Sequence, residues 1–216
     1  MTSATTKNAA HQLYPELREY LAARAAEFDL IPDDRKAELA KVADYVRTRL
    51  ARSAPAKLTF VCTHNSRRSH LSQIWAQVAA GYYGIKNVET YSGGTEATAF
   101  NPRAVAALQR AGLRITANDA SAENPRYQVK TSDHLPAQEC FSKVYDAPPN
   151  PTKDYCAIMT CAQADDACPL VMGSDLRLPI RYDDPKIGDD TDQETALYDE
   201  RTRQICREML YLMSTV

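Results

Sequence analysis

From Leu58 onward, short apolar runs alternate with stretches of helical periodicity, and this alternation restricts the fold more than any other feature. The strand-like runs occupy residues 57–61, 88–92, 155–161 and 176–182, and the helical stretches begin near Arg68, Pro102 and Glu194. Strands that alternate with helices usually form a parallel sheet covered on both faces. The sequence therefore predicts an α/β fold, with a four-stranded parallel sheet and helices on both faces.

Residues 10–53 instead show the pattern of two amphipathic helices. Apolar side chains recur at helical spacing in both, first at Leu13, Leu17, Tyr20, Leu21, Ala25 and Phe28, then at Leu39, Val42, Val46 and Leu50. Pro32 is placed to begin the second helix. Residues 51–57, "ARSAPAK", have the composition of a linker that few contacts cross. We therefore expect an N-terminal helical hairpin and linker over residues 1–55, and a second domain over residues 56–216.

One stretch, residues 117–154, does not continue the alternation of strands and helices. It is rich in Pro, Asn and Asp, and it contains two short strand-like runs, "RYQVK" and "FSKVY". These runs predict an inserted β-hairpin.

Composition excludes several classes of function. The net charge of −2 provides no field that would recruit nucleic acid or an anionic membrane, and no apolar run approaches the length of a membrane span. The first residues lack the apolar core of a secretory signal, so we expect a cytoplasmic protein. Six cysteines in such a protein favour catalysis, metal binding or redox exchange over structural disulfides.

The segment "LTFVCTHNSRRSHLSQIWAQ" places Cys62 at the end of a strand and Arg68 at the start of a helix. A helix N-terminus offers unpaired backbone N–H groups and a positive potential, so the loop from Thr63 to Arg68 is suited to a tetrahedral oxyanion. The Arg68 guanidinium adds two parallel donors. The same potential favours a thiolate at Cys62, beneath the anion.

Other residues of the loop have candidate roles in this arrangement. Asn65 suits a left-handed bend, and the Ser69 hydroxyl is placed to donate to the Cys62 sulfur. The substrate-binding candidates are Thr63, His64, Asn65, Ser66, Arg67 and Ser69. The simpler alternative is a buried structural cysteine followed by surface arginines, and the surrounding strand, loop and helix argue against it.

These residues resemble a known family. "VCTHNSRRS" is similar to the phosphate-binding loop of low-molecular-weight protein tyrosine phosphatases and of the arsenate reductases that share their fold, in which a Cys and five residues precede Arg-Ser. "YSGGTEATAFNPRAVAAL" resembles the second strand, loop and helix of that fold. The resemblance covers about residues 58–214, apart from residues 117–154.

A proton donor is also needed, because otherwise the displaced oxygen must leave as an oxide. "RYDDPK" offers Asp183 and Asp184. The resemblance implies Asp184, which directly precedes a proline, as the general acid. The alternative is a solvated acidic loop, since Asp189, Asp190 and Asp192 follow closely.

The segment "TCAQADDACPL" resembles the redox segment of thioredoxin-coupled arsenate reductases and implies a disulfide relay through Cys161 and Cys168. A phosphatase has no need of this pair. Three alternatives stay open: Cys161 as an apolar strand residue, a zinc site that includes Cys156, and structural or incidental roles for Cys140, Cys156 and Cys206. The spacing of the cysteines does not suit a zinc knuckle.

Several positions depart from the family pattern. His64 replaces a usual glycine, and Arg67 replaces a residue that is often cysteine in the reductases. Gln73 stands where some reductases have an acid near a structural potassium ion, so we do not predict a bound metal. We also expect no cofactor. The phosphatases' tyrosine pair after the Asp-Pro is missing, since "KIGDD" follows Pro185. This absence argues against a phosphotyrosine peptide as the substrate.

The sequence thus predicts an arsenate reductase with Cys62 as nucleophile, Asp184 as acid, and thioredoxin as the reductant of a relay through Cys161 and Cys168. The expected ligand is an arsenate or phosphate oxyanion. One alternative is a protein or small-molecule phosphatase that uses Cys62, Arg68 and Asp184 alone. Another is a redox-sensing regulator that binds an oxyanion without turnover.

Overall fold

The computed structural model describes residues 12–167 and 171–216. Its central sheet contains β1 (Ala56–Cys62), β2 (Val88–Gly94), β6 (Tyr155–Met159) and β7 (Ser174–Pro179). The strands lie in the order β2-β1-β6-β7 and all neighbours pair in parallel. The predicted four-stranded parallel sheet is confirmed, although β6 ends two residues earlier than expected and β7 both starts and ends earlier.

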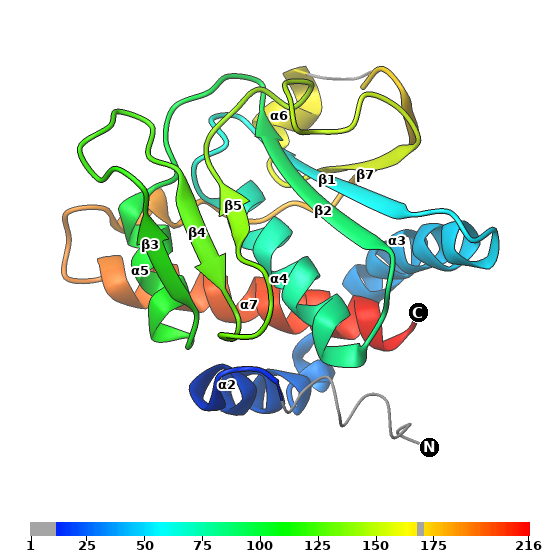
Figure 1. The fold of residues 1–216 in the computed structure, drawn as a ribbon, viewed down its shortest axis with the longest axis horizontal. Coiled ribbons are helices and arrows are strands. Elements are labelled where there is room, and N and C mark those ends of the chain that lie inside the picture. Colours follow the sequence, from blue (N-terminus) through cyan, green and yellow to red (C-terminus); the bar gives the residue numbers. More distant parts are fainter. Residues whose placement is uncertain (1–11, 168–170) are drawn as a thin grey trace.

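Helices cover both faces of this sheet, as predicted (Figure 1). Because side chains alternate along a strand, β1 buries Leu58 and Phe60 on one face and Val61 on the other. The first face packs against α3 (Asp33–Ala51), α4 (Arg68–Tyr83) and α7 (Glu194–Ser214). On the opposite face the short helix α6 (Ala162–Ala167) contacts β1 and β6. The remaining helix of the core, α5 (Pro102–Arg110), packs on α7 and begins with a proline, as expected.

The N-terminal helices are present, and they pack onto the core. They are α2 (Pro15–Ala25) and α3, with a short 3₁₀ helix, η1 (Phe28–Leu30), between them. Both contact α7, and α3 also contacts β1 and β7. Leu17, Leu21 and Leu39 are fully buried in the same core as the sheet. More contacts therefore cross the linker than its composition predicts, while the division of the chain at residue 55 stays a prediction.

A chain that starts at Ser53 is expected to lose its cooperative fold. Several leucines and valines of α2 and α3 are fully buried against the core, so removal of both helices exposes this part of the core to water. Each such side chain contributes about 1.5–3 kcal/mol, against a net stability of about 5–15 kcal/mol for a whole domain. Thermal unfolding followed by circular dichroism would measure this. A cooperative transition near that of the full chain would contradict the shared core.

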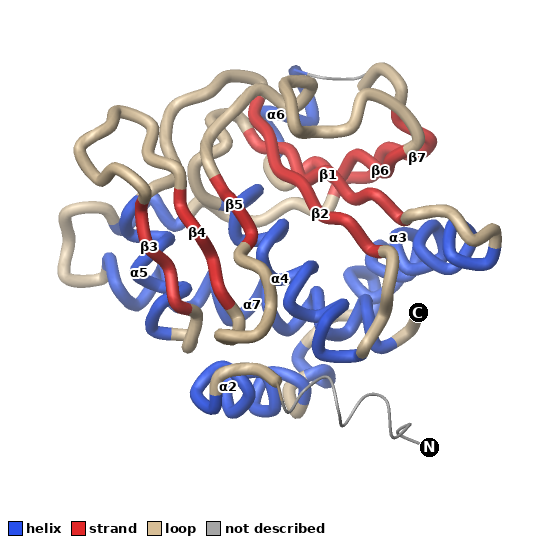
Figure 2. The backbone as a smooth tube through the Cα atoms, viewed as in Figure 1, coloured by secondary structure: helices blue, strands red, loops and turns tan. Residues whose placement is uncertain are grey.

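Residues 117–154 do not form the predicted β-hairpin. A separate antiparallel sheet contains three strands, β3 (Arg114–Ala117), β4 (Tyr127–Lys130) and β5 (Gln138–Cys140), in that order (Figure 2). The run "RYQVK" does supply β4, but "FSKVY" forms no strand. Its backbone is used elsewhere, because the Lys143 N–H donates to Asn65 Oδ1 and the Lys143 carbonyl accepts from the Gly94 N–H.

No helix among the described residues is both long enough and apolar enough to cross a bilayer.

Candidate active site

The site forms at the carboxyl edge of the parallel sheet. Cys62 is the last residue of β1, Cys161 follows β6, and Asp184 follows β7. Carboxyl ends of parallel strands share one edge, where ligands usually bind in open α/β sheets. This topology brings three distant segments to one place, with α6 at the same edge (Figure 1).

The loop after Cys62 has the geometry of an anion cradle. Asn65 adopts a positive φ of 43°, and its side chain fixes the bend by donating to Ser69 Oγ and accepting from the Lys143 N–H. Within the described residues, the backbone N–H groups from Thr63 to Arg68 have no protein acceptor. Those at the start of α4 have no intrahelical partner by geometry. The loop therefore offers its donors to a bound anion.

The hydroxyl of Ser69 lies 3.0 Å from the Cys62 sulfur. Because Asn65 Nδ2 donates to this same hydroxyl oxygen at 2.8 Å, the hydroxyl hydrogen is free to point at Cys62. Ser69 is thus set to stabilise a thiolate. Cys62 is buried, with 3% of its surface exposed.

Arg68 and Asp184 form an ion pair at the mouth of the cradle. Arg68 Nη2 donates to Asp184 Oδ2 at 2.8 Å, and Nη1 donates to the Tyr182 carbonyl at 3.1 Å. The neighbouring Asp183 also lines the pocket, but its side chain is 96% exposed and lies 3.4 Å from Arg201. Of the two candidate acids, Asp184 is the one that pairs with Arg68.

Arg67 is held in the same place by a network that the sequence did not reveal. Its Nε donates to the Tyr198 hydroxyl at 3.0 Å, and that hydroxyl donates to Asp189 Oδ1 at 2.8 Å. Its Nη1 lies 3.7 Å from Asp184 Oδ2. Tyr198 comes from α7, and no motif in the sequence relates it to the loop.

The other predicted binding residues divide into two groups. Thr63 and His64 line the pocket above the cradle together with both arginines, and His64 Nδ1 lies 2.5 Å from Glu96 Oε1. Asn65 and Ser69 lie beneath it as supports. Ser66 is buried, and its carbonyl accepts from the Asn101 N–H at the start of α5.

Cys161 is buried directly beside the loop. Its sulfur lies 3.5 Å from Thr63 Oγ1 and accepts a hydrogen bond of 3.4 Å from the Ala164 N–H of α6. Its surface is fully covered. The second cysteine of the predicted relay, Cys168, lies outside the described residues.

Three further cysteines lie away from this edge, in the core. Burial raises the pKa of the Cys140 thiol to about 12, and it also raises the pKa of Cys156 and Cys206. Such thiols stay protonated and unreactive at neutral pH. Among the described residues, no three metal-ligating side chains gather at one point.

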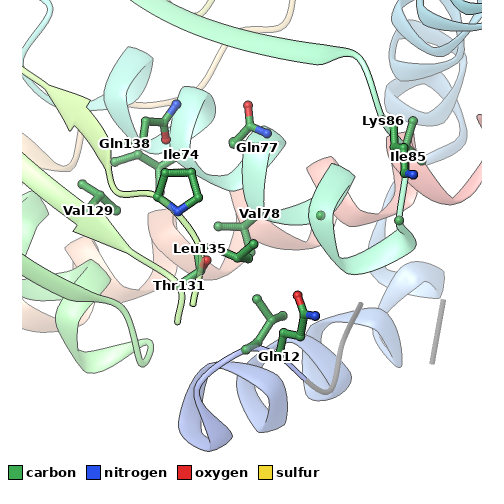
Figure 3. Close-up of a pocket in the computed structure, with 14 residues that line it drawn as sticks. Gln12, Ile74, Gln77, Val78, Ile85, Lys86, Val129, Thr131, Leu135 and Gln138 are labelled. Atoms are coloured by element: carbon green, nitrogen blue, oxygen red, sulfur yellow. The ribbon is translucent and has the colours of Figure 1, made fainter. Parts of the chain in front are cut away.

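Two cavities lie at opposite ends of α4. The one above the cradle measures about 490 Å³ and includes Arg181, Tyr182 and Lys186 in its wall. The other measures about 340 Å³, is lined largely by apolar side chains, and lies at the end of the helix that holds Val78 (Figure 3). Only the first contains the groups that an oxyanion needs.

Comparison with known proteins agrees with this geometry. Residues 57–137 match the family model of low molecular weight phosphotyrosine protein phosphatases. An arsenate reductase of Halalkalibacterium halodurans is 29% identical over 135 residues, which cover 62% of this chain and 78% of the relative. An arsenate reductase of Bacillus subtilis is 27% identical over 144 residues, covering 67% and 84%. Residues 57–137 are thus similar to the low molecular weight phosphatases, and about two thirds of the chain is similar to arsenate reductases.

Among solved structures, a low molecular weight phosphotyrosine phosphatase of Vibrio cholerae covers 74% of this chain and 95% of its own, at 14% identity and a TM-score of 0.49. The family match includes β1, the loop and α4 with all the cradle residues, and it ends before Cys161 and Asp184.

Gly94, the last residue of β2, is a further residue beside the cradle that sequence reasoning missed. It pairs with Cys62 across β1 and β2. A Cβ at this position would come within 2.2 Å of the Glu96 carbonyl oxygen, 2.6 Å of the Thr63 carbonyl oxygen and 2.7 Å of the Asn65 nitrogen. The signal was present in "SGG" at the end of a strand, since glycine within a strand often marks a close approach of two backbones.

Gly94→Ala is therefore expected to displace the loop and lower turnover by about 100-fold, the usual effect of a misplacement of about 1 Å at a catalytic centre. Gly81→Ala is the matched control, because a Cβ there meets open space and alanine favours a helix by about 1 kcal/mol. Steady-state kinetics and thermal unfolding of both variants test this. Full activity in Gly94→Ala would contradict the tight contact.

Proposed function

We propose that this protein is an arsenate reductase that works through a cysteine nucleophile and a relay of three cysteines. Cys62 is the nucleophile, and the loop from Thr63 to Arg68 binds the arsenate. Asp184 is the general acid. Cys161 resolves the adduct, and Cys168 completes the relay. The implied external reductant is thioredoxin, and the proposed location is the cytoplasm.

The first half of the reaction forms a covalent adduct. The Cys62 thiolate attacks arsenic, a sulfur–arsenic(V) bond forms, and one oxygen leaves as water after Asp184 supplies a proton. The loop N–H groups and the Arg68 guanidinium hold the remaining oxygens. The Arg68–Asp184 ion pair supports this assignment, because it keeps the acid beside the anion's position.

The second half reduces the arsenic. A Cys161 thiolate attacks the Cys62 sulfur, the sulfur–arsenic bond breaks with its electron pair on arsenic, and arsenite leaves as a disulfide forms. Cys168 then attacks Cys161 and frees Cys62. The external dithiol reduces the resulting Cys161–Cys168 disulfide.

One observation carries the choice of reduction over hydrolysis. The Cys161 sulfur lies 3.5 Å from the hydroxyl of Thr63, the residue next to the nucleophile. Hydrolysis of a thiol–phosphate adduct needs only water, so a phosphatase has no use for a second thiol in this place. The curated relatives named arsenate reductase point the same way.

The test is arsenite production with thioredoxin, thioredoxin reductase and NADPH, run beside aryl-phosphate hydrolysis. We expect NADPH oxidation that depends on arsenate and yields one arsenite per NADPH. Rapid aryl-phosphate hydrolysis without any arsenite would contradict the proposal and favour a phosphatase. Tight binding of arsenate without turnover of either substrate would favour the redox-sensing regulator.

The phosphatase is the second candidate, and one observation favours it. The pocket of about 490 Å³ above the cradle is larger than a single oxyanion requires. Its wall also contains Lys186 and Arg181, which suit an anionic substrate body.

A further inference from the structure

An ion-pair cluster joins α6 to the strand behind it. Asp165, on α6, receives the guanidinium of Arg177 at 2.5 Å on Oδ1 and Arg181 Nε at 2.9 Å on Oδ2. Arg177 also donates to the Asp165 carbonyl oxygen at 2.6 Å. Arg177 belongs to β7 and Arg181 follows its end, so one carboxylate binds the helix to two points of the sheet edge.

The carboxylate of the cluster is buried, because the Asp165 side chain is only 7% exposed. Burial alone would raise the pKa of Asp165, but hydrogen bonds from Arg181 and Arg177 lower it below its ordinary value. The carboxylate is therefore charged at neutral pH, and removal of either arginine leaves a buried charge with fewer partners.

The same helix begins directly after Cys161 and holds this residue through its first turn. The Ala164 N–H of α6 donates to the Cys161 sulfur, and the Asp165 N–H donates to the Cys161 carbonyl. α6 has only six residues, so its own backbone hydrogen bonds give it little stability. The first turn that holds Cys161 therefore depends on side-chain contacts, and the Asp165 cluster supplies charged contacts of this kind.

Arg181 belongs to two sites at once. It pairs with Asp165, and it also lines the pocket above the oxyanion cradle, where Thr63, His64 and Arg68 are found. Its side chain is half exposed and forms part of the wall of that pocket. An anion bound there competes with Asp165 for the same guanidinium.

We propose that Asp165, Arg177 and Arg181 form a clasp that keeps the first turn of α6 formed on Cys161 in the free protein, and that a bound oxyanion draws Arg181 away, loosens this turn and thereby exposes the Cys161 thiol. The inference rests on the proposed function for the role of Cys161. In this arrangement the resolving thiol is protected from stray oxidants until substrate is present. Asp165 is a positioning residue, because it acts through the helix and does not touch the substrate.

Anion binding and opening of the clasp are thermodynamically linked. An anion shifts α6 only if it binds the open form more tightly than the closed form, and anything that opens the clasp must then favour anion binding to the same degree. Asp165→Asn removes the carboxylate charge with little change in shape. It is therefore expected to imitate the effect of the anion on Cys161.

The experiment measures the alkylation of each cysteine by iodoacetamide in the reduced, full-length protein, with peptide mass spectrometry as the readout and inorganic phosphate as the anion. In the wild type, phosphate should slow alkylation of Cys62, which it covers, and accelerate alkylation of Cys161. Asp165→Asn should accelerate alkylation of Cys161 about tenfold or more without phosphate, the factor that loss of a charged hydrogen bond implies. In this variant, phosphate should cause little further acceleration of Cys161 alkylation.

Controls separate a local clasp from general destabilisation. Asp166→Asn removes the same charge one position away. The Asp166 charge acts on Arg181 only at longer range than Asp165 does, so this variant should accelerate alkylation of Cys161 far less than Asp165→Asn. Cys140, Cys156 and Cys206 are buried elsewhere and serve as internal references. Arg177→Gln should accelerate alkylation of Cys161. Phosphate should still accelerate it further in this variant, because Arg181 remains.

The outcomes distinguish the two proposals. Protection of Cys62 by phosphate with no change at Cys161 would overturn the clasp and leave the proposed function intact. No protection of Cys62 would overturn the oxyanion site and the clasp with it. Equal acceleration by Asp165→Asn and Asp166→Asn, or acceleration of all buried cysteines together, would also overturn the clasp.

Discussion

Replacement of Cys62 by serine is expected to abolish arsenate reduction and aryl-phosphate hydrolysis together. The serine hydroxyl stays protonated at neutral pH in the same cradle, so no nucleophile forms. The loop N–H groups and Arg68 are untouched, and phosphate binding should survive. Steady-state assays of both activities and calorimetric titration with phosphate measure the two effects separately.

Cys206→Ala is the matched control, because Cys206 is buried in α7 and does not line the pocket. It should leave both activities within a factor of a few. Substantial turnover of either substrate by Cys62→Ser would show that the nucleophile is another residue.

Asp184→Asn is expected to slow the chemical step by about 10²–10⁴-fold, the usual contribution of general acid catalysis. An amide at this position keeps a hydrogen-bond acceptor for Arg68 but supplies no proton at neutral pH. Single-turnover kinetics on aryl phosphate report the step directly. The loss should shrink for substrates whose leaving group departs readily without a proton.

The neighbouring acid provides the comparison. Asp183 is almost fully exposed and pairs only with Arg201 among the described residues, so Asp183→Asn should change the rate by less than about threefold. An equal or larger loss at Asp183 would reverse the assignment of the acid.

The sequence predicted the cradle well, because the strand, loop and helix that form it are contiguous. Cys62 and Arg68 belong to one segment whose local pattern sets the geometry. Asp184 and Cys161 were named from the family resemblance, and the structure places both at the carboxyl edge of the sheet, while their roles stay predictions.

Features that depend on packing between distant segments were not predicted. Asn65 was expected at a left-handed bend, but the Lys143 N–H that holds it comes from a stretch read as a hairpin strand. The N-terminal helices were read as a unit, yet their apolar stripes complete the core around α7. The partners of Arg67 and Asp165 come from α7 and β7, and no local pattern relates those residues.

The central claim is that Cys161 resolves an arsenic adduct on Cys62, and a single-turnover measurement tests it most directly. Reduced protein is mixed with excess arsenate without any external reductant, and the arsenite released per chain is counted. The account predicts about one arsenite per wild-type chain, about one from Cys168→Ser with a trapped Cys62–Cys161 disulfide, and none from Cys161→Ser. Equal arsenite from Cys161→Ser and the wild type, or no arsenite from a wild type that hydrolyses aryl phosphates, would contradict it.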